Sequence, residues 1–302
     1  MVSRPVARDD RPVGQPDNRR RGRRVRRWVI VLVVLALVLV GADFGAAAYA
    51  EHTISQKARE QLGNLSQDPS VTVHGFPFLT QALSGDYSHI SVYAAGVPVQ
   101  DKLRDVELSA ELENVTAPLS DLLAGNTKTI KIGSLKGQVT VKASDFARFS
   151  PLDKVQQLKI EPVTEDYVKS GDSGQAESTP TPTVTPTDAD GQPIDSSTAG
   201  IRISGYVQVA GQKVEIFCFA LISVKDKKIE ISPNRLQFGN DKETTVVPPA
   251  VQKALLPNFR ATINAGDLPF SVTPTAVRVN SGSVTIKGEA KNVTFTGQPA
   301  KG

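Results

Sequence analysis

One apolar run near the N-terminus constrains this chain more than any other feature. Residues 28–50 form 23 consecutive positions in which Asp43 is the only charged residue, and an arginine-rich segment precedes them. At 1.5 Å per residue, a helix over this run is about 35 Å long, which is enough to span a bilayer. By the positive-inside rule, residues 1–27 are expected to be a cytoplasmic tail, and the residues after the run extracytoplasmic.

Two interpretations of the run remain open. As a signal anchor, the helix stays in the bilayer, and the protein is a single-pass protein of the cell membrane. As a signal peptide, it is cleaved near Ala50, where Ala48-Tyr49-Ala50 matches an A-x-A site, and the mature protein is secreted or periplasmic. A carboxylate deep in lipid is costly, so Asp43 favours cleavage. The long arginine-rich segment favours the anchor, which is our preferred interpretation.

The basic charge of the chain is concentrated in its N-terminal tail. Ten of the 35 basic residues and four of the 31 acidic residues lie within residues 1–50, which leaves 25 basic and 27 acidic residues in the remainder. The part from residue 51 onward therefore has no excess of positive charge of the kind that marks nucleic-acid binding. We expect no nucleic-acid partner.

Residues that usually carry catalysis or bind metals are sparse. Cys218 is the only cysteine, so the chain can form no internal disulfide and no cysteine-based zinc site. Its apolar neighbours favour a small buried side chain. His52, His74 and His89 do not follow a metal-binding spacing, and the chain contains no nucleophile elbow, P-loop or dinucleotide fingerprint. We therefore expect no metal, no cofactor and no enzymatic activity.

Two periodicities predict the secondary structure after the run. Apolar residues three and four apart predict an amphipathic helix over residues 47–65. Period-two alternation predicts strands with one buried face, and short turns between neighbours predict an antiparallel sheet. Strands are expected at residues 71–74, 87–94, 106–112, 128–132, 135–142, 158–163, 201–209, 213–224, 227–232, 269–279 and 283–295. Short helices are expected within residues 117–125, 143–149 and 248–259.

Residues 170–198 differ from the rest of the chain in composition. They are rich in proline, threonine and serine, and Val184 and Ile194 are their only larger aliphatic residues. Such a segment buries too little apolar surface to offset the entropy of ordering, which predicts a disordered insertion. Strand signals resume after it without a new helix, so we expect residues 51–302 to form a single domain.

The segment VHGFPFLTQALSG, residues 73–85, does not fit the alternating pattern. Pro77 cannot donate a hydrogen bond within a buried strand, while a solvated loop has little reason to carry Phe76, Phe78 and Leu79 together. We expect a stiff apolar loop. Either it closes the core beneath the helix or it contacts a ligand, and the residues alone leave these two roles open.

This segment also carries a resemblance to a known family. Gly75 to Gln81, followed by Gly85 and Tyr87, resembles the LmeA-like phospholipid-binding proteins of actinobacterial envelopes, and residues 268–295 are similar to the closing strands of that family. The resemblance implies an α+β fold of the tubular (BPI-like) lipid-binding class, with a long N-terminal helix on a strongly curved antiparallel sheet. It also implies a phospholipid or related envelope lipid as partner, bound at the membrane.

With a lipid as ligand, specific residues become candidates for its site. Phe76, Phe78 and Leu79 would line the mouth of an apolar cavity or plug its end. Phe217 and Phe219 share one face of a strand whose other face is also apolar, so lipid could cover one of the two faces. Residues 128–148 contain five basic residues and a single acidic one. Three of the basic residues are candidates for a rim that contacts anionic headgroups: Lys128, Lys131 and Lys136. The alternative is that they are ordinary solvated residues.

Three functions follow from these observations. The first is an exported, membrane-tethered phospholipid-binding protein, with or without lipid transfer, which holds acyl chains in an apolar cavity. The second is a non-catalytic structural or interaction domain of the envelope. The third is a hydrolase or transferase acting on envelope lipids. The sequence favours the first, and it does not address the lipid headgroup or the oligomeric state.

Overall fold

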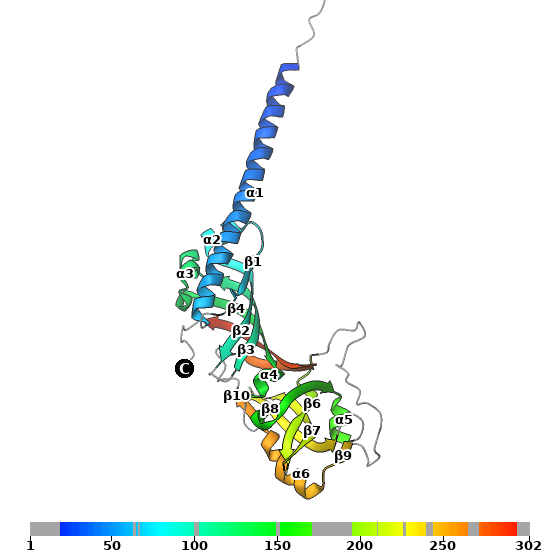
Figure 1. Ribbon diagram of the computed structural model, residues 1–302. Coiled ribbons are helices and arrows are strands. Elements are labelled where there is room, and N and C mark those ends of the chain that lie inside the picture. The colour runs from blue at the N-terminus through cyan, green and yellow to red at the C-terminus, as the bar shows by residue number, and fades with distance from the viewer. Residues whose placement is uncertain are drawn as a thin grey trace, which may run out of the picture. The chain divides into compact units, whose positions relative to one another are not determined.

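The computed structural model describes most of the chain in two compact units, residues 1–45 and 46–302. The described residues are 19–62, 65, 67–99, 103–148, 152–170, 195–209, 211–225, 228–239, 244–264 and 272–294. Residues 171–194, which make up most of the predicted insertion, lie outside them. Figure 1 shows the order of the helices and strands along the chain.

The helix α1 (Arg19–Gln61) begins in the first unit and ends in the second. Within the described residues it is the one helix long and apolar enough to cross a membrane. The large apolar side chains between residues 28 and 40 are all exposed, Trp28 by 70% and Leu37 by 65%. The N-terminal apolar segment is therefore a signal anchor or a signal sequence, and the amphipathic helix expected from residue 47 onward is the last part of α1.

The strands of the second unit form two antiparallel sheets. The first sheet has the strand order β1 (Ser70–His74), β2 (Asp86–Val99), β3 (Leu103–Thr116), β4 (Lys131–Lys142), β12 (Ser283–Thr294) and β11 (Thr273–Asn280). The second has the order β10 (Ala261–Asn264), β8 (Lys228–Gly239), β7 (Gln212–Lys225), β6 (Thr198–Val209) and β5 (Gln156–Val163), and β9 (Thr244–Val246) pairs with β8.

Short helices connect the strands. The α-helices are α2 (Phe78–Ser84), α3 (Leu119–Ala124), α4 (Ala143–Phe146), α5 (Glu165–Ser170) and α6 (Pro249–Leu255). The 3-10 turns are η1 (Thr127–Thr129), η2 (Leu152–Lys154) and η3 (Leu256–Phe259). The three short helices predicted from the sequence correspond to α3, α4 and α6, whereas α2 and α5 were not predicted.

The architecture confirms the α+β class but corrects the expected sheet. A single strongly curved sheet was predicted, whereas the described strands form two sheets. The chain leaves the first sheet after β4, builds the second sheet, and returns with β11 and β12, where β12 pairs with β4. The sheets meet through β11 and β12, because Val277, Val279 and Val284 share one core with Cys218 and Ile222 of the second sheet.

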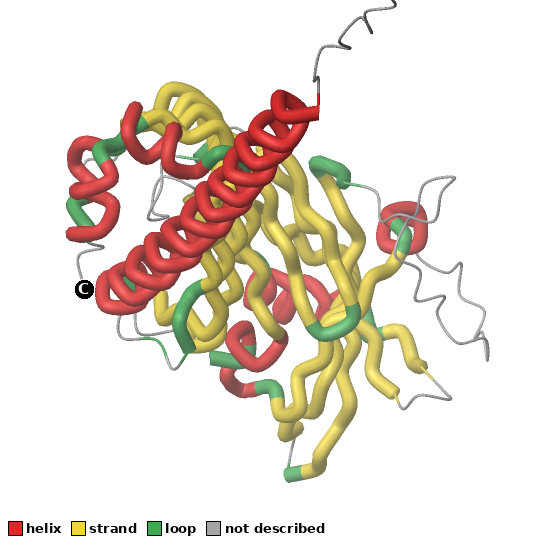
Figure 2. The backbone as a smooth tube through the Cα atoms, turned by 90° about the horizontal axis from the view of Figure 1, so that it is seen from above, coloured by secondary structure: helices red, strands yellow, loops and turns green. Residues whose placement is uncertain are grey.

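The end of α1 covers one face of the first sheet, as Figure 2 shows from above. Ala50 is buried in a core with Val73 and Phe78, and Ile54 packs against it. Two hydrogen bonds fix the helix to the start of the sheet: the backbone N–H of Val73 donates to the carboxylate of Glu51 over 2.7 Å, and the hydroxyl of Ser55 donates to the carbonyl of Pro69.

A row of irregular residues crosses the first sheet at one level. Asn114 in β3 and Asn292 in β12 both have a left-handed φ of 53°. The strand pairing is interrupted at these two residues and at Ser88 in β2 and Gly133 in β4, and the paired residues on either side place all four at the same level of the sheet. A Cβ at Gly133 would lie 3.0 Å from the Cβ of Asn114, so the closest approach in the row is occupied by glycine.

This row explains how the first sheet keeps one apolar face. On each of the four strands the apolar residues on either side of the row are three positions apart, yet all belong to the core beneath α1. The pairs are Tyr87 and Ile90, Leu112 and Val115, Ile132 and Leu135, and Ala290 and Val293. Residues three apart on a regular strand point to opposite faces. The row therefore shifts the alternation by one residue in all four strands.

Substitution of Asn114 tests this row. Asn114→Gly is expected to keep the stability of the protein, because glycine adopts a left-handed φ without a steric penalty. Asn114→Val places a β-branched side chain in that region and is expected to cost about 1–3 kcal/mol. Thermal and denaturant unfolding of the purified full chain would measure both. Equal stability of the two variants would contradict a left-handed conformation at this position.

Candidate functional site

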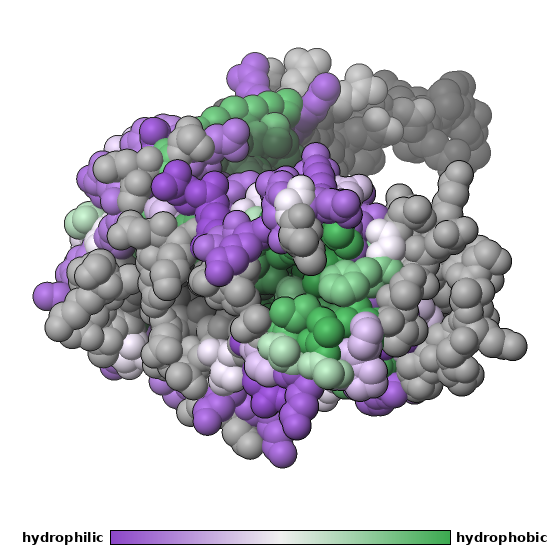
Figure 3. Space-filling model, turned by 60° about the horizontal axis from the view of Figure 1, so that its bottom comes forward, coloured by the Kyte–Doolittle hydropathy of each residue, from purple (hydrophilic) through white to green (hydrophobic). Residues whose placement is uncertain are grey.

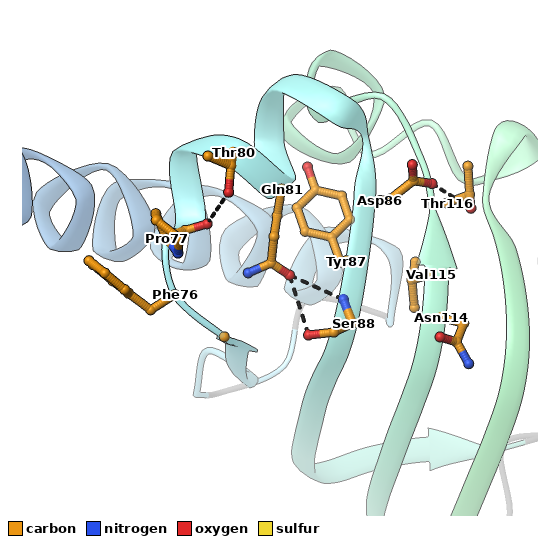
Figure 4. Close-up of a pocket in the computed structure, with 11 residues that line it drawn as sticks. Phe76, Pro77, Thr80, Gln81, Asp86, Tyr87, Ser88, Asn114, Val115 and Thr116 are labelled. Atoms are coloured by element: carbon orange, nitrogen blue, oxygen red, sulfur yellow. Dashed lines mark hydrogen bonds between the residues drawn. The ribbon is translucent and has the colours of Figure 1, made fainter.

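A pocket of about 520 Å³ lies between α2 and the start of the first sheet. Figure 4 shows it with the residues that line it, which come from the segment before α2, from α2 itself and from β2 and β3. They are Gly75, Phe76, Pro77, Thr80, Gln81, Asp86, Tyr87, Ser88, Asn114, Val115 and Thr116. Asp86 is the only charged residue among them, so the pocket offers hydroxyl and amide groups beside a few apolar ones.

The α2 helix forms one side of this pocket and has apolar residues on two sides. It follows a cis peptide bond between Phe76 and Pro77, and it ends at Gly85, which has a left-handed φ of 74°. Phe78 points inward and is 3% exposed, whereas Phe76 and Leu79 are 61% and 38% exposed. The segment was predicted to be a loop, and the structure shows a helix that begins directly after the proline.

Hydrogen bonds hold α2 against the sheet. The side-chain carbonyl of Gln81 accepts a bond from the backbone N–H of Ser88 over 3.1 Å (Figure 4). The amide group of Gln81 donates to the carbonyl of His74 over 3.3 Å. On the other side of the pocket, the hydroxyl of Thr116 donates to Asp86 over 3.0 Å. These bonds fix the walls of the pocket.

Tyr87 is the most deeply buried residue of the pocket lining. Its side chain is 1% exposed, and its hydroxyl has no hydrogen-bond partner among the described residues. Burial raises the pKa of Tyr87, because the charged phenolate would lose its hydration. A buried hydroxyl without a partner carries a free-energy cost, which a polar group entering beside it would reduce.

A second polar cluster lies on the strands next to the pocket. The rings of His74 and His89 stack with centroids 4.5 Å apart, because β1 and β2 place these residues opposite each other. Nε2 of His89 lies 2.5 Å from the carboxylate of Glu111, and the hydroxyl of Ser91 lies 2.6 Å from the same carboxylate and 2.7 Å from Nε2 of His74. The sequence alone gives no sign that the two histidines are in contact, because their contact depends on the register between β1 and β2.

Phe217 and Phe219 lie in a different part of the fold from α2. They belong to a small core of the second sheet beneath α5, together with Val163 and Val168. As predicted, both faces of β7 are covered, but here protein supplies the cover. The guanidinium of Arg235, a residue that is 9% exposed, lies 4.5 Å from the ring centre of Phe219.

The structure does not bring the five predicted apolar site residues into one site. Phe78 lies in the core beneath α1, and Phe217 and Phe219 lie in the core beneath α5. Of the three predicted rim lysines, Lys128 and Lys131 are exposed, while Lys136 forms an ion pair with Glu113 over 3.1 Å. No group of three or more histidine, cysteine or acidic residues in the described part of the chain could hold a metal ion.

Comparison with protein-family models now places the chain. Residues 41–289 match the model described as LmeA-like phospholipid-binding, which covers most of the chain. The chain belongs to the LmeA-like phospholipid-binding family. Neither the curated proteins nor the solved structures contain a significant match. The LmeA-like region includes the second sheet, the first sheet up to the middle of β12 and the pocket below α2, and the family is a lipid-binding family rather than an enzyme family.

Two phenylalanines of this LmeA-like protein should respond differently to truncation. Phe219→Ala removes a ring that is 1% exposed and is expected to destabilise the fold by about 3–5 kcal/mol. Phe76→Ala removes a ring that is 61% exposed and is expected to cost less than about 1 kcal/mol. Denaturant unfolding of both variants beside the parent chain would measure the difference. A mild effect at Phe219 would contradict its place in a packed core.

The Ser91 hydroxyl should control the acidity of its neighbour. The hydrogen bond from Ser91 is the main cause that lowers the pKa of Glu111, with His89 and His74 adding to it. A lowered carboxyl pKa stabilises the fold above the ordinary glutamate value, and this contribution is lost as the pH falls through the folded pKa. Ser91→Ala is therefore expected to raise the pKa of Glu111, measured by carbon-13 NMR and assigned with Glu111→Gln. If the titration of the Glu111 carboxyl were the same in Ser91→Ala as in the parent chain, the hydrogen bond from Ser91 to Glu111 would be refuted.

Proposed function

We propose that this protein is an exported, membrane-tethered phospholipid-binding protein of the cell envelope that holds acyl chains against apolar side chains. The observation that carries the proposal is the LmeA-like match over residues 41–289, which begins within the N-terminal apolar helix. The helix, as anchor or signal sequence, supports export across a membrane. The second unit would then act on the extracytoplasmic side.

The surface of the protein is compatible with an acyl ligand. A space-filling view shows apolar side chains gathered in a hollow, with hydrophilic side chains along part of its border (Figure 3). Burial of a methylene group contributes about 0.8 kcal/mol, so ten buried methylenes contribute about 8 kcal/mol. Such a ligand can be held without any catalytic group. The 520 Å³ pocket below α2 is of ordinary ligand size, but its polar lining suits a headgroup or glycerol better than a chain.

The predicted site residues support this function to different degrees. Phe76 and Leu79 can contact lipid as they stand, because both are exposed. Phe78, Phe217 and Phe219 are buried by protein, and lipid reaches them only if the covering helices move. Exposed Lys128 and Lys131 remain candidates for contact with anionic headgroups, whereas Lys136 is already paired with Glu113.

Photocrosslinking would test the proposal with the full chain. A phospholipid with a diazirine at the end of one acyl chain is mixed with purified protein, irradiated, and mapped by mass spectrometry. We expect labelled peptides within residues 86–294 as well as in the apolar run, because a bound chain contacts the strands of the second unit. The structural or interaction alternative predicts no label within residues 86–294, and that result would overturn the proposal. An excess of unlabelled phospholipid, which should remove specific labelling, is the control.

A further inference from the structure

The outer side of α2 is apolar and does not contribute to the core. A surface helix of a globular protein normally has one apolar stripe, which faces inward. In α2 that stripe is Phe78 with Ala82, which pack in the core beneath α1. Leu79 and Leu83, four residues apart, form a second stripe, and Leu83 is 88% exposed.

A further exposed apolar residue lies just before this stripe in the chain. Phe76, two residues before α2, is 61% exposed, and α2 itself contains no charged residue. Phe76, Leu79 and Leu83, here called the apolar ridge, therefore lie on a segment where no ionised side chain would have to leave water on contact with lipid. Exposed large apolar side chains gathered in this way mark interaction surfaces.

The strand before the apolar ridge is bonded to α1 just after the apolar run ends. The bond is made at Glu51, which accepts the backbone N–H of Val73 over 2.7 Å. Glu51 is the first residue after the apolar run 28–50, and it lies six residues, or about 9 Å of helix, beyond Gly45. Tyr49, which is 69% exposed, lies between them, and tyrosine is enriched at membrane interfaces.

We propose that the apolar ridge docks onto the bilayer, with Phe76, Leu79 and Leu83 inserted at the level of the headgroups. The ridge would give the second unit a membrane contact besides its tether, and would present the pocket below α2 to the lipid surface. This inference rests on the membrane attachment in the proposed function. The occupant is a lipid surface, because the strand before the ridge is bonded to the residue that directly follows the apolar run.

Depth-dependent quenching in the full chain would test this docking. Cys218 is fully buried and burial raises the pKa of its thiol to about 12, so an introduced cysteine can be labelled selectively. Leu83→Cys carries a bimane label, and the protein is reconstituted into vesicles with lipids brominated along their chains. We expect the label to lose more than about half of its emission, as insertion by 5–10 Å requires.

Val251→Cys on α6 is the matched control, because Val251 is also apolar and is 39% exposed. Its label should stay largely unquenched. Equal quenching at the two sites, or no quenching at Leu83→Cys, would overturn the docking. A disulfide-linked dimer of unlabelled Leu83→Cys, formed in detergent and in vesicles alike, would assign the ridge to a second copy of the chain and would also overturn it.

A charge variant gives an independent measurement. Leu83→Glu changes a side chain that is 88% exposed, so circular dichroism and thermal unfolding should match the parent chain. A label on Thr80→Cys, on the same helix, should lose most of its quenching in the Leu83→Glu background.

Acyl-chain crosslinks in residues 86–294 report on the proposed function separately. Crosslinks there without quenching at the ridge would refute the docking alone, and quenching without them would refute lipid holding alone.

Discussion

The packing of α1 on the first sheet depends on a break in side-chain alternation. A strand of 12 or 14 residues with strict alternation would keep one apolar face, but the sequences of β2, β3, β4 and β12 are out of phase at their two ends. At the level of Asn114, Asn292, Ser88 and Gly133, the alternation of side chains shifts by one residue, so that the apolar residues at both ends of each strand point to the same face. A continuous apolar surface results, and α1 lies on it.

The second sheet is covered by protein on both faces of its strand β7. One face of β7 packs on β11 and β12 of the first sheet, and the other face is covered by α5 and the side chain of Arg235. The guanidinium of Arg235 lies 4.6 Å from the ring centre of Tyr167 and 4.5 Å from that of Phe219, and it donates to the carbonyl of Tyr167 over 3.1 Å. Cation–π contact with these rings offsets part of the cost of burying this cation. One face of β7 therefore packs in a core shared by the two sheets, and the other face packs in a separate small core.

Local patterns in the sequence predicted most elements but not their assembly. The amphipathic end of α1 and the alternating strands could be read directly, because their periodicity repeats over many residues. The α2 helix was missed because Pro77 and two phenylalanines indicated a loop, whereas proline also fits just before a helix. Two sheets were not foreseen, since the pairing of β4 with β12 joins residues about 150 positions apart. For the same reason, the stacking of His74 on His89 could not be predicted.

The ends of the segment around residues 171–194 have a consequence for the evolution of this chain. Before it, Val168 of α5 is fully buried; after it, Asp195 pairs with Arg278 and Lys287, and the carbonyl of Ser196 accepts the N–H of Val277. Both ends are therefore fastened by folded structure. For a flexible loop, which is what the composition of this segment predicts, doubling the length costs only about 0.6 kcal/mol, so mutations that lengthen or shorten it are expected to meet little thermodynamic resistance. Selection is thus free to vary its size without redesigning either sheet.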